Sequence, residues 1–123
     1  MADYVPVFKP GEDLTMTAAA DIVGGRLVRV SGNNTVQETS AATSGWLGIA
    51  TQDAKSGSKV TVTSGGVQEP TVAAAVVAGD VLIPAADGRV TPIAAAEDYS
   101  QVVGIALTAQ PTAGQKCRAR FIR

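Results

Sequence analysis

The side chains that could carry out chemistry are few in this chain of 123 residues, and they are scattered. Histidine, the commonest general base and a usual zinc ligand, is absent from the sequence. The carboxylates lie in or beside expected turns, without the paired spacing that general acid and base catalysis requires. They are Asp53, Asp80, Asp87, Glu97 and Asp98. We therefore expect no catalytic residue, no metal site and no cofactor, and we expect that the protein is not an enzyme.

Cys117 is the single cysteine, so an intramolecular disulfide cannot form. In an extended segment it would alternate with Lys116 and Arg118 and would point inward together with Ala119 and Phe121. This pattern favours a small buried apolar group. A reactive thiol is the alternative interpretation.

The cations at the end of the chain form a second candidate site. Lys116, Arg118 and Arg120 would share one face of the last strand, with Arg123 just beyond. Such a stripe could follow a phosphate backbone, but no aromatic platform accompanies it, and the chain has 10 basic against 11 acidic residues. We favour a solvated strand face or a contact with an acidic protein surface, and we expect no specific nucleic acid partner and no membrane partner.

Trp46 is the single indole, and it directly precedes the segment Leu-Gly-Ile-Ala. Indoles carry a large apolar surface and often anchor cores or interfaces. We expect Trp46 to anchor the core or a subunit interface, and we consider ligand stacking the alternative.

The elements that would position these residues are short strands. Valine and threonine, 16 and 12 residues, are branched at Cβ and suit a pleated strand. Residues 27–30 and 35–38 predict one hairpin, residues 81–83 and 89–91 predict another, and residues 59–63 alternate as a half-buried strand. We expect an all-β fold, a small compact β-barrel or sandwich of short antiparallel strands, with at most one short helical turn.

An internal echo indicates two related β units. Gly25-Arg26-Leu27-Val28 is similar to Gly79-Asp80-Val81-Leu82, and other similar pairs of segments lie 54 to 57 residues apart. Trp46-Leu47-Gly48-Ile49-Ala50 corresponds in this way to Val102-Val103-Gly104-Ile105-Ala106. We expect a single β domain over residues 18–123, with related units at about 24–63 and 78–121.

Residues 1–17 differ from the rest and predict an extended N-terminal arm. Pro6 would not be tolerated in a central strand, and Pro10-Gly11 breaks the chain. The arm could contact a partner by adding an edge strand, or it could be a frayed terminus or an edge strand of its own domain. The start of the chain lacks the features of a signal peptide, and no apolar stretch is long enough to span a bilayer, so we expect a soluble product made in the cytoplasm.

Several short motifs together resemble the capsid cement proteins of tailed bacteriophages. They are Ala-Gly-Asp-Val-Leu at residues 78–82, Asp-Gly-Arg-Val at 87–90, Val-Gly-Ile-Ala at 103–106 and Gly-Gln-Lys-Cys-Arg-Ala at 114–119. The resemblance covers about residues 14–122. It implies a compact β domain that assembles as a homotrimer on the outside of the expanded head, without catalysis or cofactor. The implied location is therefore the virion, on the outer surface of the head.

The resemblance also implies a partner, the major capsid protein, and a function, stabilisation of the shell against internal DNA pressure. The arm would supply the capsid contact through Tyr4, Val5, Val7, Phe8 and Lys9. A carbohydrate-binding or adhesion module is the alternative function, and it would need exposed aromatics from among Tyr4, Trp46 and Tyr99. A lipoyl carrier is disfavoured because the expected hairpin tip at residues 84–88 has no lysine.

Overall fold

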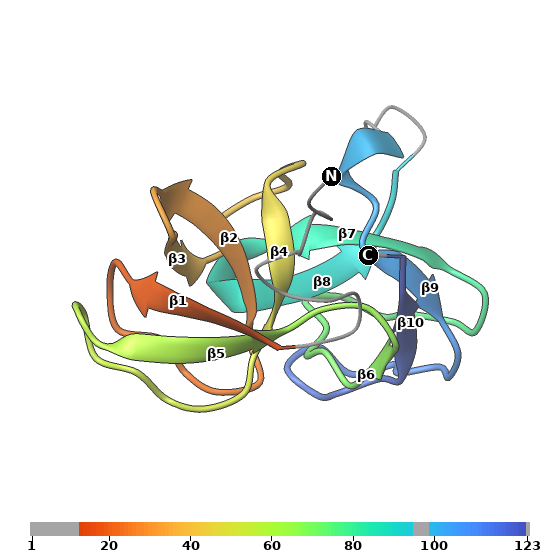
Figure 1. Ribbon diagram of the computed structural model, residues 1–123. Coiled ribbons are helices and arrows are strands. Elements are labelled where there is room, and N and C mark those ends of the chain that lie inside the picture. Colours follow the sequence, from red (N-terminus) through yellow and green to blue (C-terminus); the bar gives the residue numbers. More distant parts are fainter. Residues whose placement is uncertain (1–12, 95–98, 123) are drawn as a thin grey trace, which may run out of the picture.

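The computed structural model describes residues 13–94 and 99–122. These residues form two β units that lie side by side (Figure 1). Strands of the first unit close into a barrel in the order β1-β3-β2-β4-β5. They are β1 (Leu14–Ala18), β2 (Leu27–Gly32), β3 (Thr35–Glu38), β4 (Trp46–Ala50) and β5 (Lys59–Thr63).

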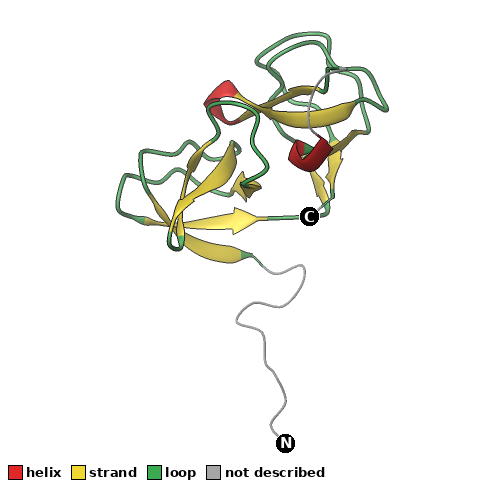
Figure 2. Ribbon diagram, turned by 90° about the horizontal axis from the view of Figure 1, so that it is seen from above, coloured by secondary structure: helices red, strands yellow, loops and turns green. Residues whose placement is uncertain are grey.

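The second unit is a five-stranded sheet in the order β6-β10-β9-β7-β8. Its strands are β6 (Val67–Gln68), β7 (Val81–Ala85), β8 (Arg89–Pro92), β9 (Gly104–Ala106) and β10 (Ala119–Phe121). Two single 3-10 turns, at Ala86–Gly88 and Tyr99–Gln101, are the helical elements among the described residues (Figure 2). The all-β prediction is confirmed. The described residues contain two helical turns, where the sequence analysis expected at most one.

The expected hairpins are confirmed, and their turns explain them. β2 pairs with β3 through a turn in which Asn34 has a φ of 50°, and β7 pairs with β8 through a turn in which Asp87 has a φ of 60°. Asparagine and aspartate tolerate this left-handed conformation better than other residues with a side chain. In β5, Val60 and Val62 are buried while their neighbours are less so, as the alternation predicts.

The two units share one topology. Starting from β1, the neighbours run β5, β4, β2 and β3, and starting from β6 they run β10, β9, β7 and β8. The parallel pairing of Ala18 with Val36, which closes the barrel, has its counterpart in the parallel bridge between Val72 and Val90. Equivalent turns also match, since Gly57 and Gly114 have φ values of 86° and 85°. The residues that echo one another in the sequence therefore occupy equivalent places in the fold.

The start of the first unit corrects our boundary for the arm. We assigned residues 14–17 to the arm, but they belong to β1, which pairs antiparallel with β5 and parallel with β3. Apolar and polar residues alternate in this strand as Leu14, Thr15, Met16 and Thr17, so one face of it can pack on the barrel interior.

Each unit has a core of small aliphatic side chains. The barrel core consists of Ala18, Ile22, Val28, Val36, Ala50, Ala54, Val60 and Val62. The second core consists of Val72, Val76, Leu82, Val90, Val103, Ala106, Cys117, Ala119 and Phe121. Leu27, Trp46 and Ile49 come from barrel strands but pack into the second core, so the two units share a continuous apolar junction.

Polar contacts also cross this junction. The buried Thr39 hydroxyl donates to the carbonyl of Ala85 at 2.8 Å, and the Gly88 amide donates to the carbonyl of Thr39 at 3.0 Å. Gly88 has a φ of 66°, and a Cβ there would lie 2.6 Å from Cβ of Arg26. Only glycine allows the two backbones to approach so closely in this conformation. The junction therefore fixes the second unit against the barrel.

Candidate functional site

The expected capsid-contact residues lie outside the described part of the chain. They are Tyr4, Val5, Val7, Phe8 and Lys9. The structure does place the point where this segment joins the barrel. The Thr63 hydroxyl donates to Asp13 Oδ1 at 3.0 Å, immediately before β1, so the segment leaves the barrel beside the end of β5.

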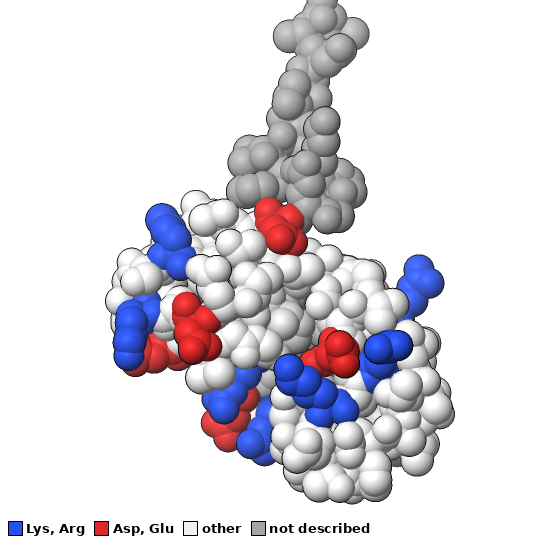
Figure 3. Space-filling view, turned by 90° about the horizontal axis from the view of Figure 1, so that it is seen from below, with Lys and Arg blue, Asp and Glu red and all other residues white. Residues whose placement is uncertain are grey.

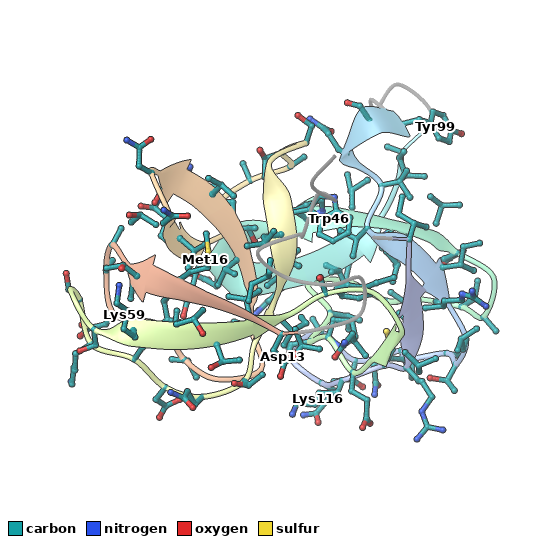
Figure 4. The ribbon with its side chains drawn as sticks, viewed as in Figure 1. Asp13, Met16, Trp46, Lys59, Tyr99 and Lys116 are labelled. Carbon is teal, nitrogen blue, oxygen red and sulfur yellow. The ribbon has the colours of Figure 1, made fainter. Side chains whose placement is uncertain are left out.

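Trp46 lies in the junction between the units and is 3% exposed. Its ring meets the Phe121 ring edge to face, with centroids 5.7 Å apart and planes at 83°. Figure 4 shows Trp46 between β4 and the second unit, whereas Tyr99 projects outward at a distant place. Trp46 is thus a core residue of this chain, and it cannot form a surface platform for a sugar together with Tyr99.

The described carboxylates that we singled out serve turns. Asp53 Oδ1 accepts from the Gly24 amide at 2.7 Å, and Asp80 Oδ2 accepts from the Val77 amide at 2.9 Å. Asp87 forms the left-handed turn between β7 and β8, while Glu97 and Asp98 lie outside the described residues. Side chains of this kind stabilise turns by satisfying backbone donors. Within residues 13–94 and 99–122, no group of three potential metal ligands is present.

Glu38, a carboxylate that the sequence analysis did not single out, links two segments of the barrel. Glu38 accepts from Arg26 Nη1 through Oε1 at 2.9 Å and from the Val23 amide through Oε2 at 2.8 Å. It thereby links the end of β3 to the segment that enters β2. The spacing of twelve residues between Arg26 and Glu38 gives no sequence signal, because it arises from the register of the hairpin.

Cys117 points into the second core and is 3% exposed, as its alternation with Lys116 and Arg118 predicted. Burial raises the pKa of the Cys117 thiol above its ordinary value, and a backbone hydrogen bond offsets part of that shift. A neutral thiol is a poor nucleophile. Cys117 therefore acts as an apolar side chain at neutral pH.

Lys116, Arg118 and Arg120 are exposed on the outer side of the segment that ends in β10. In the view of Figure 3, basic and acidic side chains are interspersed, and broad uncharged areas separate them. That side of the molecule thus presents no continuous basic surface of the kind that follows a phosphate backbone.

The surface also has an open groove of about 540 Å³ where the two units meet. Its lining includes Gln52, Asp53, Gln68, Glu69 and Lys116, so it is polar and carries both signs of charge. No apolar wall or convergent set of ionisable groups makes it a typical small-molecule pocket.

Comparison with known proteins gives the chain its family. The family of phage cement proteins matches residues 8–121, which is most of the chain. The chain belongs to the phage cement protein family. This cement protein is therefore a structural, capsid-associated phage protein, and its family is not a family of enzymes.

A solved structure has the same fold as this cement protein. It is the N base of head fiber gp8.5 in bacteriophage phi29, with a TM-score of 0.66 and 21% sequence identity. The alignment covers 89% of this chain and 92% of that chain. No curated protein matches the sequence. The described residues contain no helix that is long and apolar enough to cross a membrane.

Proposed function

We propose that this cement protein binds the outer surface of the expanded phage head as a homotrimer and stabilises the shell against internal DNA pressure. The observation that carries the proposal is the family match over residues 8–121, together with the two β units that pack on one apolar junction. A body with a shared apolar junction keeps its shape under load, because its interior is closely packed. The major capsid protein would be its partner.

The mechanism is stabilisation by binding. A protein that binds the assembled, expanded shell and not its separated subunits lowers the free energy of the shell by mass action. Three copies joined in a trimer would hold neighbouring capsid subunits at high effective concentration, so that each contact can be weak. We expect such binding to raise the force or temperature at which filled heads open.

The N-terminal segment would provide one of these contacts. Tyr4, Val5, Val7 and Phe8 carry apolar side chains, and Lys9 adds a positive charge. An extended segment of this composition can add a strand to an exposed sheet edge of a capsid subunit. Because Asp13 is held at Thr63, the segment would start from a fixed point on the barrel.

Co-sedimentation with phage heads tests this proposal. Full-length protein is mixed with expanded heads that lack it and, separately, with unexpanded precursor shells. We expect binding to expanded heads alone. A form lacking residues 1–12 should lose most of this binding while keeping its far-UV circular dichroism spectrum. The deletion stops at residue 12 because residues 14–18 are a barrel strand, and their loss would unfold the body.

Two results would contradict the proposal. Equal binding to both kinds of shell would remove the link to expansion, and equal binding by the truncated form would remove the role of the N-terminal segment. Light scattering tests the trimer separately, since a monomer at the concentrations used in sedimentation would exclude it.

A further inference from the structure

A row of side chains crosses the outer face of the second unit. Val67 of β6 pairs with Arg120 of β10, Arg120 pairs with Ile105 of β9, and Ile105 pairs with Val81 of β7. Directly paired residues of antiparallel strands project from the same face of a sheet. Val67, Arg120 and Ile105 are exposed, and Val81 is partly exposed. Apolar and cationic side chains therefore lie next to one another on this face.

A second row continues the same face. The Leu107 amide donates to the carbonyl of Arg118 at 2.7 Å, which places these two exposed residues side by side beyond β9 and β10. No carboxylate in residues 13–94 and 99–122 forms an ion pair with Arg118 or Arg120. We call the surface formed by Val67, Ile105, Leu107, Arg118 and Arg120 the β9-β10 face.

The surface of the first unit that corresponds to the β9-β10 face is covered by the second unit. Ile49 pairs with Leu27 across β4 and β2, as Ile105 pairs with Val81 across β9 and β7. Ile49 and Leu27 are 8% and 0% exposed because the second unit covers them, whereas Ile105 is 46% exposed. Equivalent positions of the two units are thus buried against a neighbouring unit in the first unit and uncovered in the second.

We propose that the β9-β10 face docks on an acidic protein surface of the phage head. Arg118 and Arg120 form no ion pair with a carboxylate of the described residues, so their charges can pair with carboxylates of a partner. Ile105 and Leu107 would provide the apolar centre of the contact. Arginine is enriched in protein interfaces because its planar guanidinium binds carboxylates through two hydrogen bonds. The apolar residues between the charges favour a protein over nucleic acid, whose backbone would leave them without a matching surface.

This inference rests on the proposed function, in that the acidic surface belongs to the head. It adds a second contact, independent of the N-terminal segment, and it predicts that binding weakens as salt rises. It also predicts which residues carry that salt dependence.

The test uses full-length protein and expanded heads that lack it. The variant Arg118→Glu/Arg120→Glu should bind about tenfold more weakly and should lose most of the salt dependence. The control Lys55→Glu/Lys59→Glu changes the net charge equally on exposed residues of the first unit, and it should bind as the wild type does. Ile105→Ser tests the apolar centre and should also weaken binding, while its circular dichroism spectrum should stay unchanged.

Three other results are possible, and each contradicts one named part of the two proposals. If the wild type binds and Arg118→Glu/Arg120→Glu binds equally well, the β9-β10 face is not the contact, and the proposed function stands. If the wild type does not bind heads, both proposals fail. If Arg118→Glu/Arg120→Glu loses binding to a short duplex DNA but keeps binding to heads, the face takes nucleic acid and the acidic protein surface is excluded.

Discussion

Gly48 in β4 and Gly104 in β9 are equivalent glycines that each face the backbone of the next strand. A Cβ at Gly48 would collide with the carbonyl of Thr63, and a Cβ at Gly104 would collide with the carbonyl of Arg120. Both glycines sit in the repeated Gly-Ile-Ala motif. In both units, the motif therefore places a glycine where the backbones of two neighbouring strands approach closely.

Gly104→Ala should destabilise the protein by about 3 kcal/mol, because strands β9 and β10 must separate to make room. Urea unfolding followed by circular dichroism measures the change. Gly57→Ala is the control: a Cβ there meets nothing within 4 Å, but the φ of 86° remains strained, so about 1 kcal/mol is expected. Equal costs for the two variants would show that backbone approach at Gly104 is unimportant.

The junction between the units should depend on the pair formed by Trp46 and Phe121. Trp46→Ala should cost about 3–5 kcal/mol through the cavity that it leaves. A double-mutant cycle with Trp46→Leu and Phe121→Leu should give a coupling of about 0.5–1.5 kcal/mol for the edge-to-face contact. Calorimetry provides these values, and strictly additive single costs would argue against direct coupling.

Glu38 should contribute more to stability than an exposed carboxylate does. Glu38→Gln weakens both the contact with Arg26 and the acceptor for the Val23 amide, and we expect a loss of about 1 kcal/mol. The matched control is Asp21→Asn. Asp21 also accepts from a backbone amide, that of Ser56 at 2.9 Å, but its ion pair with Lys55 is 3.9 Å long and solvent-exposed. This substitution should change stability by no more than a few tenths of a kcal/mol. Thermal melts at low and high salt separate the two.

Stability should fall at alkaline pH in a way that depends on Cys117. The folded state holds the thiol neutral with a raised pKa, so the contribution is complete below the ordinary pKa of 9.0 and is lost as pH rises from there through the folded value. The slope attributable to this group is at most about 1.4 kcal/mol per pH unit. Cys117→Val, which places the residue of the equivalent position Val60 there, should remove this part of the slope. An unchanged slope in that variant would assign the alkaline loss to other groups.

The sequence predicts the strands best where one face is buried and the other is solvated. In β5, Val60 and Val62 alternate with polar residues, so period and burial agree. The turns are equally readable, because Asn34 and Asp87 are among the few residue types that adopt a positive φ. Residues 14–17 alternate in the same way, yet the sequence analysis placed them in the arm, with an edge strand of the domain itself as an alternative.

Burial of Leu27 and Ile49 could not be predicted from local pattern. Leu27 and Val28 are adjacent and apolar, so both faces of β2 are apolar, and the alternation cannot say what covers the outer one. The cover is the second unit, whose first strand begins at Val67, 40 residues after Leu27 and 18 after Ile49. The same limit applies to the β9-β10 face, because its exposure depends on what packs against the second unit and not on the sequence of its strands.

The single tryptophan lies at the place where the two units meet. Its intrinsic fluorescence therefore reports on that place and on no other part of the molecule, because the emission of a buried indole shifts when water reaches it. An unfolding curve recorded in this way measures separation of the units. A barrel that opened far from Trp46 while the units stayed together would leave the emission unchanged. Comparing the fluorescence unfolding curve with the calorimetric one would then show whether the barrel opens before the units separate.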